Sequence, residues 1–227
     1  MADFKLMNND PIEAYFELAE RRPHLFAQSE RVPLIMDKEK MRAFSEEKAL
    51  PMGVVFSNEP YYYVVADLCG KNDRPFRYSR VIYCNPDSNG VVAIPVCGGK
   101  FGLITHYRHA PRLESIEFPR GFSDKKGLGP AETVRGELSE ELGVGADQCS
   151  VRLLGAVRAD GGLSAGLAQV FCAEISEDAS IRIGEEEGIS RFCWVDESQL
   201  QAMIREGQIT DGFTLSAYAM YQCLPSL

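Results

Sequence analysis

The sequence predicts an α/β fold, a sandwich of helices around a mixed sheet, preceded by helices and further strands. The order of elements is the main observation: strands fill residues 52–107, one helix follows, and more strands and terminal helices come after it. This order favours a layered sandwich over a run of parallel βαβ units. The 227 residues, 45% hydrophobic and 25% charged, suffice for one full core with an extension.

The first 50 residues form a predicted helical N-terminal extension. Apolar residues recur at helical spacing after Asp10 and Pro11, a cap followed by a first-turn proline. A second helix is expected over residues 37–48, with Asp37 as its cap and Met41 and Phe44 on one face.

Residues 51–88 are predicted to form N-terminal strands, and residues 89–227 the main domain. Runs rich in β-branched and aromatic residues predict strands, and turn signals separate them. Gly98-Gly99 indicates a hairpin, and residues 70–75 indicate a turn. The predicted strands are 54–56, 61–65, 78–83, 91–96 and 101–107.

One clear helix is predicted over residues 130–142. Gly129 stands at its N-cap, Pro130 fits the first turn, and Gly143 ends it. Strands are expected again at 151–157, 167–174 and 191–195, then helices at 197–205 and 212–223.

The charge and the segment lengths exclude several classes of protein. A net charge of −9 argues against general binding of nucleic acid or of an anionic membrane. No apolar run approaches the length of a membrane span, and the N-terminus does not resemble a signal peptide. The seven cysteines contain no C-x-x-C pair, so we expect buried thiols in a cytoplasmic protein.

The predicted central helix carries three carboxylates on one face. Glu137, Glu140 and Glu141 stand at i, i+3 and i+4, whereas Val134, Leu138 and Leu142 form an apolar stripe for the core. Carboxylates so close together repel one another unless a hard divalent cation such as Mg²⁺ is bound. A solvated acidic face is the alternative interpretation of this spacing.

The residues around this helix resemble the Nudix hydrolase family. Residues 137–144, E-L-S-E-E-L-G-V, resemble the end of the Nudix box, R-E-U-x-E-E-x-G-U. Residues 91–108 resemble the hairpin that ends in Q-Y-R in the ADP-ribose pyrophosphatase branch, and Glu117 to Phe122 resemble its E-L-P-x-G segment. The segments 186–195 and 209–214 resemble that branch's C-terminal pattern, so the resemblance covers about residues 90–220.

The resemblance implies a Nudix-type α/β/α sandwich that hydrolyses the pyrophosphate bond of ADP-ribose or a related nucleoside diphosphate sugar. It implies Mg²⁺, or Mn²⁺, as cofactor, held by Glu137, Glu140, Glu141 and the backbone carbonyl of Arg120. The three glutamates are the implied catalytic residues, and the implied substrate-binding residues are Arg108, Glu117, Arg120 and Gly121. Related pyrophosphatases dimerise through N-terminal strands, which implies a homodimer with a small nucleotide as its other partner.

The chain departs from the family pattern at three places. Gly136 replaces the arginine of the box, although Arg135 precedes it, and Leu128 replaces the first glutamate. Gly166 stands where related enzymes carry a catalytic glutamate, so Gly166→Glu is expected to raise turnover if the glycine-rich loop accepts a side chain. Glu186 and Glu187 are alternative sources of that carboxylate. The departures favour a second hypothesis, a non-catalytic Nudix-fold module that binds a nucleotide metabolite or a protein partner.

Overall fold

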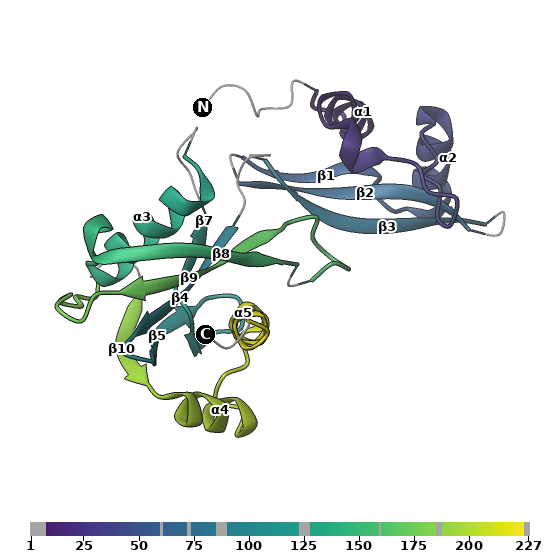
Figure 1. The fold of residues 1–227 in the computed structure, drawn as a ribbon. Coiled ribbons are helices and arrows are strands. Elements are labelled where there is room, and N and C mark those ends of the chain that lie inside the picture. Colours follow the sequence, from purple (N-terminus) through teal and green to yellow (C-terminus); the bar gives the residue numbers. More distant parts are fainter. Residues whose placement is uncertain are drawn as a thin grey trace. The chain divides into compact units, whose positions relative to one another are not determined.

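The computed structural model describes residues 8–59, 61–71, 74–84, 90–122, 128–158, 160–184 and 188–224. The chain divides into two compact units (Figure 1). Unit 1 comprises Met1–Asp87 together with Asp160–Gly166, and unit 2 comprises Ser88–Ala159 together with Leu167–Leu227.

Unit 1 packs two helices and a short 3₁₀ turn against an antiparallel sheet of order β1-β2-β3. Asp10 caps α1 by accepting hydrogen bonds from the backbone N–H groups of Ile12 and Glu13. Beneath the helix, Asp67 is buried and accepts hydrogen bonds from the Tyr15 hydroxyl and from Arg80. The elements are α1 (Pro11–Arg21), η1 (Pro23–Phe26), α2 (Lys38–Lys48), β1 (Gly53–Asn58), β2 (Tyr62–Lys71) and β3 (Arg74–Tyr83).

Unit 2 is built on a mixed sheet whose central path is β10-β5-β4-β9-β8. β4 and β9 are parallel, whereas the other pairs are antiparallel, and β6 and β7 pair with β5 and β4. The strands are β4 (Gly90–Cys97), β5 (Lys100–Arg108), β6 (Leu113–Glu117), β7 (Arg120–Phe122), β8 (Cys149–Val157), β9 (Ala168–Ile175) and β10 (Ile189–Val195). The helices are α3 (Pro130–Leu142), η2 (Ala146–Gln148), α4 (Glu197–Arg205) and α5 (Gly212–Gln222).

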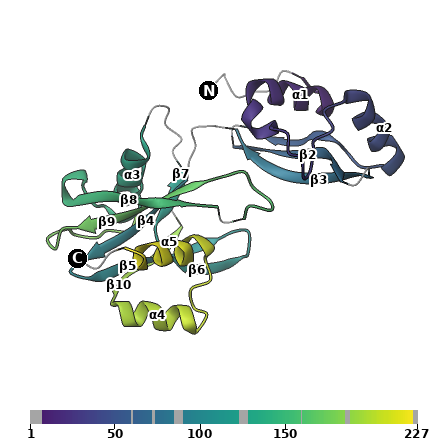
Figure 2. The ribbon, with the colours of Figure 1, turned by 45° about the vertical axis from the view of Figure 1, so that its right-hand side comes forward.

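Helices cover both faces of the unit 2 sheet (Figure 2). Along β4, Val92 and Ile94 belong to the core shared with α4 and α5, whereas Val91 and Ala93 belong to the core shared with α3. This alternation follows from the two-residue period of a strand. The predicted α/β sandwich with a mixed sheet is therefore confirmed.

Some boundaries differ from the sequence prediction. The chain reverses within residues 70–75 as predicted, but the connection is shorter than expected, because Gly70 pairs with Pro75 and Lys71 with Arg74, so both strands continue into this segment. Pro75 is tolerated because β3 is an edge strand of its three-stranded sheet. The short strands β6 and β7 were not expected as strands. The Gly98-Gly99 hairpin is confirmed, with positive φ at both glycines.

All seven cysteines are free, and four of them are buried. Burial raises the pKa of the Cys69 and Cys172 thiols to about 11, so both are neutral at pH 7. No helix in the described part of the chain has the length and apolar character needed to cross a bilayer.

Candidate functional site

Helix α3 carries the candidate site and forms where its end signals predict. Glu132 accepts a hydrogen bond from the backbone N–H of Gly129 at the N-cap, and Pro130 occupies the first turn. Gly143 ends the helix in the left-handed conformation, at φ 68°. Val134, Leu138 and Leu142 are fully buried against the sheet, which fixes the rotation of the helix about its axis.

The three carboxylates of α3 differ in exposure. Glu140 is exposed and Glu137 is partly buried, whereas Glu141 is only 2% exposed. The sequence pattern separates Glu141 from the apolar stripe of the helix, whereas the structure buries it. Glu141 follows Val134 by seven residues, two helical turns, and so belongs to the edge of the buried stripe.

Gly121 lets the carboxylate of Glu137 approach the backbone of β7. A Cβ atom at residue 121 would lie 2.1 Å from Glu137 Cδ and 2.1–2.2 Å from both carboxylate oxygens. Only glycine leaves room for this carboxylate, which thus lies against the peptide that follows Arg120. The structure brings together Glu137 and the Arg120–Gly121 segment, as the sequence hypothesis requires.

We expect Gly121→Ala to displace the Glu137 carboxylate. If Glu137 has the catalytic role that the sequence resemblance implies, magnesium-dependent turnover should fall by about 10- to 100-fold, because a shift of about one ångström in a catalytic group has an effect of this size. The fold should survive, because the displaced atoms end a flexible side chain. Steady-state assays measure the effect. Gly136→Ala is the matched control, because a Cβ at residue 136 meets no atom within 4 Å. Equal activity of the two variants would contradict the role of the Gly121 contact.

The side chain of Arg120 contacts Asp211, the N-cap residue of α5, and Phe213 within α5. Its Nη2 lies 3.3 Å from Asp211 Oδ1, and its guanidinium carbon lies 4.9 Å from the centre of the Phe213 ring. Asp211 also caps α5 by accepting hydrogen bonds from the backbone N–H and the hydroxyl of Thr214. The segment 209–214, noted in the sequence without a role, therefore anchors β7 to α5.

Glu117 forms the centre of an ion-pair chain. It is fully buried, and its carboxylate accepts hydrogen bonds from Nε and Nη2 of Arg108. Its Oε1 also lies 3.5 Å from Arg120 Nε. Because a bidentate pair fixes the plane of a guanidinium, Glu117 positions Arg108 at the end of β5.

His106 lies on β5, two residues before Arg108. Burial lowers its pKa, and the charge of Arg108 lowers it further. The imidazole is thus neutral at pH 7. His109 instead contacts Arg112 through its ring nitrogens.

Arg135 is next to Gly136, where the family pattern has an arginine. Within the described residues, Arg135 makes no contact that would replace that arginine. Its Nη1 donates to the carbonyl oxygen of Ala131 on its own helix, at 3.4 Å. Leu128, in place of the first glutamate of the box, is 42% exposed. The loop that joins β7 to Leu128 lies outside the described residues.

We expect Gly136→Ala to stabilise unit 2 by about 0.5–1 kcal/mol, the difference between glycine and alanine inside a helix. The space around residue 136 is open, so no clash opposes this gain. Trp194, the one tryptophan of the sequence, lies in β10 of unit 2. Urea unfolding followed by its fluorescence measures the change, and a destabilised variant would contradict the expectation.

The glycine-rich loop after β8 is held in place within unit 1. Asp160 accepts hydrogen bonds from the backbone N–H groups of Gly162 and Leu163, and Ser164 forms a bridge with Val81 of β3. A Cβ at Gly166 would lie 2.4 Å from Cε2 of Tyr83. The expected gain from Gly166→Glu is therefore opposed by the Tyr83 ring. Glu186 and Glu187 lie outside the described residues.

The donor chemistry of the site fits magnesium. Glu137, Glu140 and Glu141 offer only carboxylate oxygens, which are the ligands that Mg²⁺ prefers. Glu140 and Glu141 also stand in the last turn of α3, where no basic residue offsets the negative end of the helix dipole. In the described residues, no three His, Cys, Asp or Glu side chains are already grouped closely enough to hold a metal.

Comparison with known proteins shows a likeness in fold. No family model matches the sequence, and no curated protein matches it. The crystal structure of an ADP compounds hydrolase matches with a TM-score of 0.58 at 14% sequence identity. The match covers 74% of this chain and 88% of that chain, and at this identity it shows the fold alone.

Proposed function

We propose that this chain is a magnesium-dependent hydrolase that cleaves the pyrophosphate bond of ADP-ribose or of a related nucleoside diphosphate sugar. The observation that carries the proposal is the Glu137 carboxylate seated against Gly121, with Glu141 one turn further along α3. The likeness in fold to an ADP compounds hydrolase supports it.

The proposed roles follow from where each side chain lies. Glu137, Glu140 and Glu141, with the carbonyl of Arg120, would hold the metal, which neutralises phosphate charge and lowers the pKa of a bound water. A helix carboxylate not engaged with metal would accept the proton of the attacking water. Arg108 pairs with Glu117 through Nε and Nη2, which leaves the Nη1 edge of the guanidinium to meet a phosphate.

Release of AMP from ADP-ribose by the purified full chain tests the proposal. We expect AMP to form with Mg²⁺ or Mn²⁺ and not with EDTA, as measured by chromatography. A panel of nucleoside diphosphate sugars then ranks substrates by kcat/KM. No turnover of any member with either metal would overturn the proposal.

A non-catalytic nucleotide-binding module is the second candidate function. The observation that favours it is the contact between Gly166 and Tyr83, which leaves no space for the catalytic glutamate of the related enzymes. Magnesium-dependent binding of ADP-ribose without turnover would support this candidate.

We also expect a homodimer. The three-stranded sheet of unit 1 ends at β1, and an open strand edge favours pairing with another chain. Light scattering at micromolar concentration should give twice the mass of the 25.2 kDa chain. A monomeric mass would contradict this expectation.

A further inference from the structure

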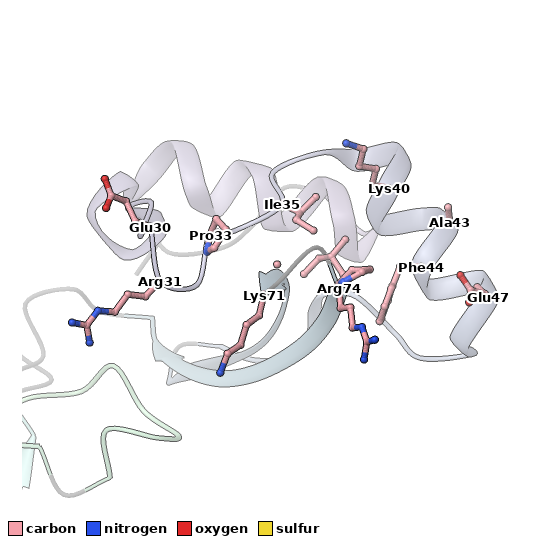
Figure 3. Close-up of a pocket in the computed structure, with 13 residues that line it drawn as sticks. Glu30, Arg31, Pro33, Ile35, Lys40, Ala43, Phe44, Glu47, Lys71 and Arg74 are labelled. Atoms are coloured by element: carbon pink, nitrogen blue, oxygen red, sulfur yellow. The ribbon is translucent and has the colours of Figure 1, made fainter.

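Unit 1 contains a cavity of about 610 Å³, distant in sequence from the candidate hydrolase site (Figure 3). Its walls come from the segment before α2, from α2 itself and from the ends of β2 and β3. This volume lies in the range of small-molecule sites. Ile35, Phe44 and Leu68 give the cavity an apolar lining.

Cationic side chains dominate the polar part of the cavity. Arg31, Lys40, Lys71 and Arg74 line it against two carboxylates, those of Glu30 and Glu47, in a chain whose net charge is −9. Lys40 lies 3.8 Å from Asp37. In the described part of the chain, Arg31, Lys71 and Arg74 make no ion pair.

Lys71 and Arg74 face each other across the β2–β3 pair. They are direct partners in the strand register, and like charges in this position destabilise a sheet. In Figure 3 their side chains extend below Ile35 and end apart from each other, Lys71 toward the lower left and Arg74 toward the lower right. Asn72 and Asp73, which join the strands, lie outside the described residues. A bound anion would offset the repulsion between the two cations.

We propose that this cavity binds a small organic phosphate. The phosphate group lies between Lys71 and Arg74, and the apolar or aromatic body packs on Ile35, Phe44 and Leu68. A phosphate monoester carries a charge of about −1.5 to −2 at pH 7, which matches several cations better than a single carboxylate does. Guanidinium groups also bind phosphate oxygens in a bidentate manner.

Calorimetric titration of the full chain with AMP in EDTA tests the proposal. AMP supplies both a phosphate and an aromatic body. EDTA removes the metal that the proposed hydrolase site requires, so the result does not depend on that proposed function. We expect one AMP site per chain, weaker binding of inorganic phosphate, and weaker binding of adenosine.

Two variants locate the site. Lys71→Gln/Arg74→Gln should weaken AMP binding by at least about tenfold, because charge-assisted contacts to the phosphate are lost. Lys100→Gln/Arg205→Gln removes the same charge from exposed positions of unit 2 and should leave the affinity unchanged.

Gly70→Leu tests the apolar lining separately. A Cβ at residue 70 would meet Pro33 Cγ at 3.6 Å and Ile35 Cδ1 at 3.8 Å, so a larger side chain there enters the cavity without a backbone clash. We expect it to weaken AMP binding and to spare binding of inorganic phosphate.

The proposal would be overturned if AMP did not bind in EDTA, if the two charge variants lost affinity equally, or if AMP and inorganic phosphate bound with equal affinity. Adenosine binding as tightly as AMP would exclude the cationic contact and so also contradict it.

Discussion

Glu141→Gln is expected to lower magnesium-dependent turnover of ADP-ribose by at least about hundredfold, as loss of one group that stabilises transition-state charge does in other enzymes. Glutamine keeps the volume and one oxygen of the buried side chain but removes the charge that a metal requires. Because Glu141 is 2% exposed, few alternative groups or waters reach the same position. Steady-state assays with increasing Mg²⁺ measure the loss.

Unfolding measurements with and without Mg²⁺ show whether Glu141 binds the metal or is only a buried structural residue. Without metal, we expect the variant to remain folded, because the substitution conserves the shape of the buried side chain. Added Mg²⁺ should stabilise the wild type through binding and should stabilise Glu141→Gln less.

Two controls accompany this comparison. Glu140→Gln makes the same change at an exposed position of the helix, and Glu177→Gln makes it at an exposed residue outside α3. Glu140→Gln should lose activity without any change in metal-free stability, and Glu177→Gln should behave as wild type. Full turnover by a folded Glu141→Gln protein would exclude the proposed metal site.

Local signals in the sequence predicted α3 well and the burial of its side chains less well. The proline after the N-cap, the glycine at the C-cap and the stripe of Val134, Leu138 and Leu142 specify a helix and its buried face. A spacing of four residues leaves Glu141 outside that stripe, whereas the spacing of seven from Val134 includes it. The burial of Glu141 could thus have been predicted from the sequence pattern.

The ion-pair chain that joins Glu117 to Arg108 and Arg120, and Arg120 to Asp211, could not be predicted from the sequence. Arg120 and Asp211 are 91 residues apart, and they meet where the start of α5 reaches β7, at the point where the Thr214 hydroxyl accepts a hydrogen bond from the backbone N–H of Phe118. The close contact between Gly121 and Glu137 is of the same kind, because it depends on how far α3 lies from β7. A single sequence carries residue types and local periods, not these distances.

Unit 1 shows how tertiary pairing changes a local prediction. Residues 70–75 contain turn-forming residues, yet the register of β2 and β3 continues through Gly70 and Pro75. Similarly, the glycines of the loop after β8 suggested mobility or a nearby ligand, whereas Gly166 is instead required by its contact with Tyr83. For Gly166 the partner strand β3 lies far away in the sequence, so no local window around Gly166 contains it.

Glu117→Gln is expected to destabilise unit 2 by about 2–4 kcal/mol, the largest stability effect of any single substitution considered. Glu117 is fully buried between Arg108 and Arg120, so its removal leaves two guanidinium groups without their shared carboxylate. Their side chains are 25% and 22% exposed, and access to water keeps the cost below that of a fully buried pair. Urea unfolding followed by Trp194 fluorescence reports on this unit.

A matched control and a double-mutant cycle show whether the ion pair causes the loss. Glu114→Gln changes an exposed glutamate of the same strand, β6, and should alter stability by less than about 0.5 kcal/mol. Arg108→Gln in the Glu117→Gln background removes one of the stranded cations, so the double variant should lose less stability than the sum of the two single variants. Additive losses would show that Glu117 acts through packing alone, and would remove the argument that it positions Arg108 for a phosphate.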